Sequence, residues 1–182
     1  MEPQSPGEAA EELPGASALI SNLKTAISSI HQNHYRYVPN PPSCKKRASV
    51  ALVVRIRPTF PQMSHYDSNN CGLPVGSFQK RLDNFFAQNW VQQGEPEVLF
   101  IKRAARKGDR WTSHIAFPGG KRELDDLNDR STSLRETREE VGLDLDVDHF
   151  LMVGNLAERV VATSWGKVPY VLLQVLVYGS SY

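Results

Sequence analysis

The stretch 119–143 reads GGKRELDDLNDRSTSLRETREEVGL and decides the fold that we predict for this chain. Near its end, Glu136, Glu139 and Glu140 have the spacing i, i+3, i+4, which places their side chains on one face of a helix. Gly142 is a natural residue to end that helix, because glycine readily adopts the left-handed conformation of a C-terminal cap. The three carboxylates therefore lie in the last two turns, where the helix dipole favours cations.

Three acids in that position repel one another and oppose the dipole, so a bound cation is one explanation of the pattern. Carboxylate oxygens suit Mg²⁺ or Mn²⁺, and no His or Cys lies nearby in the sequence. The alternative is a solvated helix face on which the glutamates pair with Arg135 and Arg138. Taken alone, the three glutamates are at least as compatible with this second interpretation.

The surrounding residues favour the cation site. A Phe-Pro-Gly-Gly turn at 117–120 follows a β-leaning apolar stretch and precedes the helix. The segment resembles the Nudix box, G-x5-E-x7-R-E-U-x-E-E-x-G-U, where U is aliphatic. Thr137 replaces one aliphatic residue of the pattern. Five residues separate Gly120 from Asp126, which stands where the pattern has Glu, and eight residues rather than seven separate Asp126 from Arg135. Glu123 is the alternative acid, and the choice between it and Asp126 stays open. The matching positions are Arg135, Glu136, Glu139, Glu140, Gly142 and Leu143.

The resemblance implies an α/β fold, a Nudix-type α/β/α sandwich around a mixed sheet. It also implies Mg²⁺- or Mn²⁺-dependent hydrolysis of a diphosphate linkage in a nucleoside diphosphate derivative. Glu136, Glu139 and Glu140 would hold the metal ion, and Arg135 would orient a glutamate. Gly119 and Gly120 would let the backbone approach the metal and the phosphates. The general base would be Glu139, Glu140 or an acid from a later loop, for which Glu158 is a candidate unless it is simply a surface residue.

The substrate prediction depends on residues upstream of the box. Residues 99–104, followed by the turn at 117–120, resemble the signature of coenzyme A diphosphatases. The expected L-L-T-x-R reads LFIKR here, so Arg103 matches a substrate-binding position of the signature. Coenzyme A or a derivative is the lead substrate, with other nucleoside diphosphate derivatives open. A basic loop at 104–111 would contact phosphates and stack Trp111 on a ring, or would simply be solvated.

The chain divides into an N-terminal extension at 1–45 and a domain at 46–182. The extension has a disordered start, an amphipathic helix at 16–31 and a Pro-rich linker. In the domain we expect strands at 48–56, 97–103, 115–117, 150–156 and 168–177, and an insertion at about 59–95 that contains a helix at 77–93. Nudix domains normally continue past the last strand with another helix. We therefore expect either a truncated domain or a sheet covered by the helix at 16–31.

Composition limits the partners. The chain has 182 residues, 21 basic and 20 acidic, so its net charge of +1 gives no case for nucleic acid or a membrane surface. No apolar run approaches the roughly 18–20 residues that span a bilayer. Cys44 and Cys71 lack metal-type spacing, and reduced thiols are expected. The chain shows no secretory or organelle address, which leaves the cytoplasm by elimination.

The expected partners are a small diphosphate substrate and a second copy in a homodimer. The alternative function is a catalytically silent or truncated Nudix-like domain that binds a nucleotide or a protein.

Overall fold

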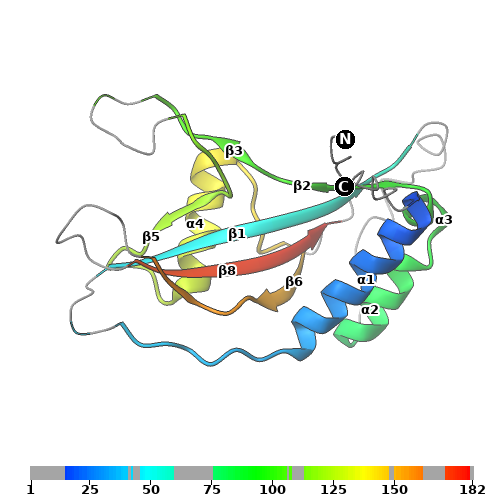
Figure 1. Cartoon of the computed structure of the whole chain (residues 1–182), viewed down its shortest axis with the longest axis horizontal. Coiled ribbons are helices and arrows are strands. Elements are labelled where there is room, and N and C mark those ends of the chain that lie inside the picture. Colours follow the sequence, from blue (N-terminus) through cyan, green and yellow to red (C-terminus); the bar gives the residue numbers. More distant parts are fainter. Residues whose placement is uncertain are drawn as a thin grey trace, which may run out of the picture.

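The computed structural model describes residues 15–40, 42, 46–59, 76–105, 107, 113–147, 150–161 and 171–180. Among these residues, six strands form one mixed sheet and two form a separate hairpin (Figure 1). In chain order the elements are α1 (Ala16–Gln32), β1 (Lys46–Arg57), α2 (Phe78–Phe86), α3 (Asn89–Gln92), β2 (Glu95–Val98), β3 (Ile101–Lys102), β4 (Ile115–Ala116), β5 (Gly119–Lys121), α4 (Asp129–Val141), β6 (Phe150–Asn155), β7 (Arg159–Val161) and β8 (Val171–Ser180).

Strand β1 is the centre of the sheet. It pairs in parallel with β8 along one edge, and on the other edge it pairs antiparallel with β5 and then with β2. Strands β6 and β7 pair antiparallel with the far edge of β8. The predicted strand 48–56 is thus confirmed, with two more residues at its start and one at its end.

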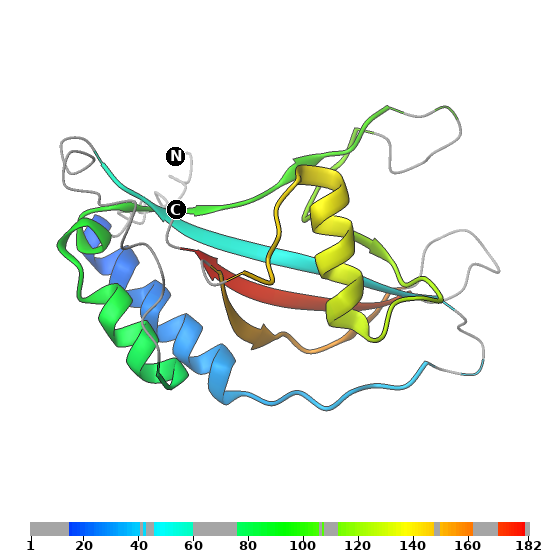
Figure 2. The same ribbon diagram turned by 180° about the vertical axis from the view of Figure 1, so that it is seen from behind.

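Helices cover both faces of the sheet, because β1 is apolar on both sides. Ala51 and Val53 pack with Leu145 beneath α4, whereas Ile56 packs with Ile20 and other buried residues of α1 and α2. Figures 1 and 2 show α4 on one face of the sheet and the pair α1–α2 on the other. The predicted α/β/α sandwich is confirmed, and α1 is the helix that covers the second face.

Two predicted elements are divided. The helix expected at 77–93 breaks at Ala87 and Gln88 into α2 and α3. The strand expected at 97–103 is divided after Val98. The chain stays beside β1 as far as the bond from the N–H of Leu99 to the carbonyl of Val53, and it then leaves β1 and pairs with β4. Most of the polar part of the expected insertion, as well as Cys44 and Cys71, lies outside the described residues.

Candidate active site

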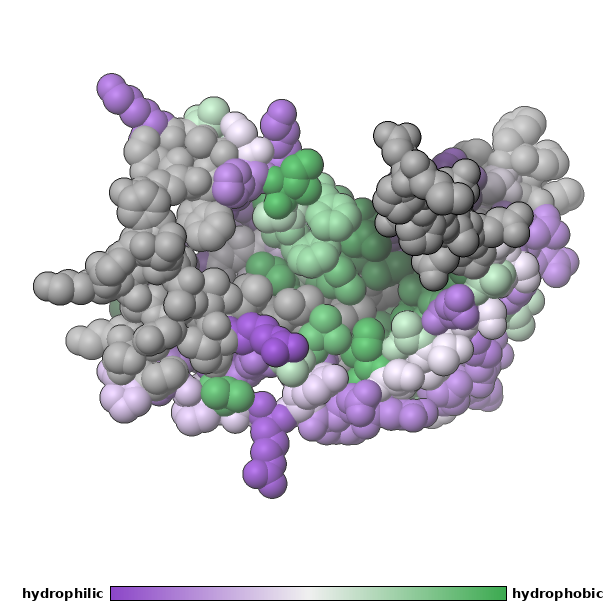
Figure 3. Space-filling model, viewed as in Figure 1, coloured by the Kyte–Doolittle hydropathy of each residue, from purple (hydrophilic) through white to green (hydrophobic). Residues whose placement is uncertain are grey.

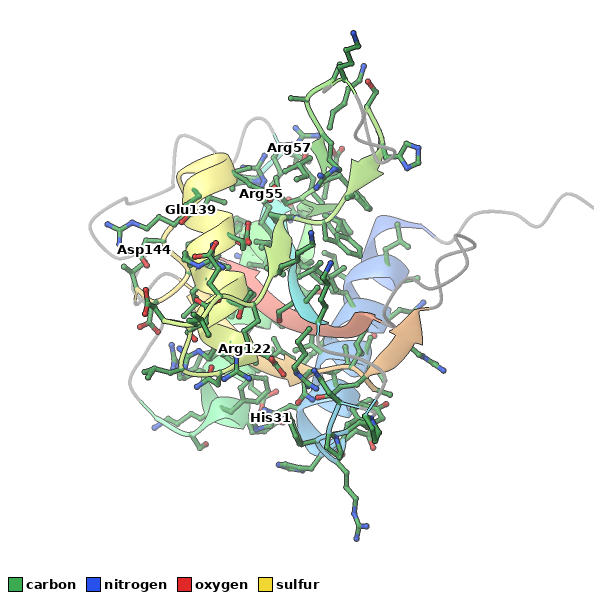
Figure 4. The ribbon with its side chains drawn as sticks, turned by 90° about the vertical axis from the view of Figure 1, so that its left-hand side faces the viewer. His31, Arg55, Arg57, Arg122, Glu139 and Asp144 are labelled. Carbon is green, nitrogen blue, oxygen red and sulfur yellow. The ribbon has the colours of Figure 1, made fainter. Side chains whose placement is uncertain are left out.

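Helix α4 has a well-defined cap at each end. At its start, the side chain of Asn128 accepts a hydrogen bond from the N–H of Ser131 at 2.9 Å, and the Ser131 hydroxyl accepts one from the N–H of Asn128. At its end, Gly142 has a φ of 72°, the left-handed conformation predicted for it. The box glutamates consequently occupy the last two turns of α4, where their charges oppose the helix dipole. Figure 4 shows Glu139 on this helix, with Arg122 towards its other end.

The two glycines of the turn face two of the glutamates. The N–H of Gly119 donates to Oε2 of Glu140 at 2.9 Å. Gly119 has a φ of 148°, which disfavours any side chain, and its Cα packs directly against the backbone of β1. A methyl group added to Gly120 would overlap the carboxylate of Glu136. The turn therefore needs glycine at 119 because of the backbone conformation and the adjacent strand β1, and at 120 because of the adjacent Glu136 carboxylate.

Arg135 joins the glutamates to the loop that precedes the helix. Its Nη1 atom lies 3.3 Å from Oε1 of Glu136 and 3.3 Å from Oε2 of Glu139. Its Nη2 atom also donates to the carbonyl of Lys121 at 3.1 Å. The single guanidinium charge is therefore shared between two of the three glutamates while Arg135 fixes the loop against α4.

Asp126 is the acid that anchors Arg135. Its carboxylate accepts bonds from Nε and Nη2 of Arg135 at 3.1 and 3.0 Å, and from the hydroxyl of Thr132 at 2.9 Å. These bonds, chiefly those from Arg135, lower the pKa of Asp126 to about 2. Glu123 is two-thirds exposed and reaches only to 3.9 Å of Nη1, so the structure gives the anchoring contact to Asp126.

Glu136 is the least exposed of the three box glutamates, at 17% of its side chain. Burial is the main cause that raises its pKa, and the negative charges of Glu140 and Glu139 raise it further. Arg135 acts in the opposite direction without cancelling these effects. The site is therefore one in which a second positive charge would be stabilising.

The donor set fits a hard divalent cation, since it consists of carboxylate oxygens. Within the part of the chain that the structure describes, however, no three His, Cys, Asp or Glu side chains converge into a ready-made metal cluster. Each carboxylate is held by a protein partner: Glu140 accepts a bond from Gly119, whereas Glu136 and Glu139 share Arg135. Metal binding at this site would require these side chains to exchange partners.

Glu158 does not lie on the surface. Its side chain is 1% exposed and accepts a bond from Nη2 of Arg47 at 2.7 Å. Arg47 also binds Asp129, the first residue of α4, through Nε and Nη2. Glu140 is eleven residues further along that helix, a rise of roughly 16 Å. Glu158 is thus placed with the opposite end of α4, away from the turn that contacts Glu140.

The upstream residues lie in the hairpin of β3 and β4. The N–H of Arg103 donates to the carbonyl of His114 at 3.0 Å, which places Arg103 at the hairpin directly after β3. Lys107 is exposed, whereas Arg106, Arg110 and Trp111 lie outside the described residues. Phosphate binding by Arg103 stays a prediction.

Comparison with known proteins identifies the domain. The family model of the NUDIX domain matches residues 87–169, a range that includes all of the predicted site residues. Residues 87–169 of this chain are therefore similar to the NUDIX domain. The similarity agrees with the predicted resemblance to the Nudix family.

Three relatives show how far the similarity extends. The uncharacterized protein C14C4.10c of Schizosaccharomyces pombe is 36% identical over 161 residues, 86% of this chain and 41% of that protein. The mitochondrial coenzyme A diphosphatase NUDT8 of Mus musculus is 40% identical over 57 residues, 31% of this chain and 27% of that protein. The uncharacterized Nudix hydrolase NudL of Yersinia pestis strain Pestoides F is 39% identical over 80 residues, 42% of this chain and 37% of that protein. The chain thus spans less than half the length of these relatives.

Among the residues that the structure describes, no helix has both the length and the apolar character needed to cross a membrane.

Proposed function

We propose that this protein hydrolyses a diphosphate linkage in a nucleoside diphosphate derivative, with Mg²⁺ or Mn²⁺ as its cofactor. The observation that carries the proposal is the close approach of the turn to α4, where Gly119 bonds to Glu140 and Gly120 faces Glu136. This arrangement gathers negative charge at a backbone turn that has no side chains of its own. The match to the Nudix family model over residues 87–169 supports it.

The box residues have distinct parts in the proposed reaction. Glu136, Glu139 and Glu140 would hold the metal ion, which when bound neutralises the diphosphate and lowers the pKa of a water molecule. Glu139 or Glu140 accepts the proton of the attacking water. Arg135 acts as a positioning residue, because its contacts run to Asp126 and to two glutamates. The Gly119–Gly120 backbone leaves room for the phosphates.

Coenzyme A or one of its derivatives is the proposed substrate. The short similarity to the coenzyme A diphosphatase NUDT8 supports this, as does the upstream segment with Arg103. The proposed compartment is the cytoplasm, and a homodimer is the proposed assembly. Nucleic acid and membranes are not proposed as partners, since the net charge is +1.

The proposal is tested by hydrolysis assays of the purified chain with Mg²⁺ and coenzyme A, ADP-ribose, a dinucleoside polyphosphate or NADH. Glu139→Gln and Glu140→Gln should each abolish cleavage while the protein still unfolds cooperatively near the wild-type temperature. Asp144→Asn is the matched control, because Asp144 lies just beyond α4 and is half-exposed. Its carboxylate lies 3.9 Å from Arg138 and accepts a bond from the N–H of Asp146 at 3.1 Å, away from the turn.

Hydrolysis that persists in both glutamine variants would refute the assignment of the site. A folded wild-type protein that cleaves none of the four compounds would instead favour the silent domain that only binds a ligand. Binding of the same compounds would then be measured by thermal stabilisation.

A further inference from the structure

Two phenylalanine rings form an exposed stack next to the candidate active site. The ring centroids of Phe100 and Phe117 lie 4.9 Å apart, and the ring planes differ by 20°. Phe117 is half-buried, but Phe100 is 54% exposed although it is a large apolar side chain. One face of the Phe100 ring is thus supported by protein, and a large part of the ring is open to solvent.

The alternation of side chains along the chain explains the exposure. Leu99 packs towards the core beneath α4, with Ala51 and Val53. Its neighbour Phe100 therefore projects towards the other face of the sheet. On that face α1 packs around Ile56, which lies at the far end of β1 from the turn. The stack lies where the sheet has no helix of its own among the described residues.

Other apolar side chains surround the stack. Ile115 on β4 is 70% exposed and Val98 at the end of β2 is 42% exposed. Figure 3 shows hydrophobic residues gathered in a hollow on this face, between the hairpin and the helices α1 and α2. An open aromatic ring flanked by aliphatic side chains is suited to a flat, partly apolar ligand.

The stack is joined directly to the Gly119–Gly120 turn. Phe117 precedes Gly119 by two residues, so their Cα atoms are at most about 7 Å apart. The intervening Pro118 is buried, and its carbonyl accepts a bond from the N–H of Ala51 at 2.8 Å. Gly119 in turn bonds to Glu140. The short segment 117–119 therefore carries the Phe117 ring and, two residues later, the N–H that bonds to the Glu140 carboxylate.

We propose that Phe100, supported by Phe117, stacks on the nucleobase of the diphosphate substrate. The inference rests on the proposed function and adds to it the side chain that holds the base of the substrate. Stacking on an aromatic side chain tolerates every base, since each has a π-face. Phe100 thus selects a nucleoside end as a class and does not discriminate between adenine and other bases.

The test uses Phe100→Leu, which keeps an apolar side chain of similar size but removes the ring face, and Phe100→Tyr, which restores a ring. With ADP-ribose or coenzyme A, Phe100→Leu should raise KM by about 5- to 150-fold, with kcat changed much less, and Phe100→Tyr should return KM to near the wild-type value. Hydrolysis of a dialkyl diphosphate, which has no ring, should be the same in all three proteins. Tyr35→Ala is the control, because it removes an aromatic ring of comparable exposure, 42%, from another segment.

A binding measurement separates this inference from the proposed function. ADP with Mg²⁺ is titrated into the Glu140→Gln protein, with and without Phe100→Leu, by calorimetry. Weaker binding with Phe100→Leu supports the stack even if no diphosphate is cleaved. Equal binding and equal KM in the presence and absence of the ring would overturn it while leaving the hydrolase proposal intact. A change of oligomeric state in Phe100→Leu, with unchanged ADP binding, would also overturn it and would identify the patch as a contact between copies.

Discussion

Replacement of Gly120 by alanine separates catalytic geometry from stability. The backbone of Gly120 lies outside the left-handed region, so alanine can adopt its conformation. The added methyl group would nevertheless overlap the Glu136 carboxylate. To restore van der Waals contact that carboxylate must move by about 1 Å, and a displacement of this size in an active site lowers activity on the order of 100-fold. The overpacking itself should cost about 1–3 kcal/mol of unfolding free energy.

Gly142→Ala is the matched control for this effect. Gly142 has a φ of 72°, and an added methyl group would meet nothing within 4 Å. The substitution should therefore cost about 1–2 kcal/mol through backbone strain alone, without moving a box carboxylate. The two variants should lose comparable stability, roughly 2–4 °C in melting temperature for each kcal/mol, yet only Gly120→Ala should lose activity.

The assay is diphosphate hydrolysis at 25 °C, where both variants remain folded, together with calorimetric unfolding. The value of kcat/KM should fall about 100-fold in Gly120→Ala and stay within about 3-fold of wild type in Gly142→Ala. If Gly120→Ala keeps full activity, the approach of Glu136 to the turn has no part in catalysis. If Gly142→Ala loses as much, the loss reflects general destabilisation of α4, and the argument from the turn fails.

Four further outcomes follow from the ion pairs and the metal. Asp126→Asn should destabilise the fold by about 2–4 kcal/mol because it weakens the bonds to Arg135, while Glu123→Gln should change the unfolding free energy by less than about 0.5 kcal/mol; denaturant titration measures both. Because the folded-state pKa of Asp126 is lowered to about 2, its contribution of at most about 2 kcal/mol should be nearly complete above about pH 4 and be lost as the pH falls through 2. The difference in unfolding free energy between wild type and Asp126→Asn should therefore narrow over that range. Arg47→Met should cost about 3–5 kcal/mol because it removes the buried cation that pairs with both Asp129 and Glu158. The half-exposed Arg55→Met on the same strand should cost less than about 1 kcal/mol. Removal of divalent ions by EDTA should abolish hydrolysis, and Mn²⁺ should raise the melting temperature of wild type more than that of Glu136→Gln; equal shifts would contradict the assigned ligand.

Local sequence patterns predicted the elements that they control. Periodicity and the Gly142 cap fixed the end of α4, and the β-branched run fixed β1 to within two residues. The breaks in two elements were missed, because they depend on partners distant in sequence, such as Val53 for Leu99. The choice between Glu123 and Asp126 could not be made from spacing alone, since it depends on which carboxylate reaches Arg135 in three dimensions.

The buried pair of Arg47 and Glu158 illustrates the same limit. Arg47 stands just before the strand predicted from apolar residues, and Glu158 is 111 residues away from it in the sequence. One signal was present in the sequence: Arg47 has the same parity along β1 as Ala51 and Val53, so an extended strand turns all three to the α4 face. The alternation of side chains along β1 does not predict that Asp129, at the start of α4, is the acid that pairs with Arg47.

The charges at the two ends of α4 support a functional interpretation of its glutamates. At the N-terminus, Asp129 complements the helix dipole and pairs with Arg47, so both effects stabilise the fold. At the C-terminus, each glutamate opposes the dipole by about 0.3–1 kcal/mol, and each close pair of them repels by a few tenths more. Arg135 offsets part of that cost for Glu136 and Glu139, while Glu140 bonds to the turn. The helix is therefore anchored at the end where charge is favourable, and it holds unfavourable charge where Gly119 and Gly120 leave the backbone open. A purely structural helix gains nothing from that second arrangement, whereas a helix that binds a cation and a diphosphate requires it.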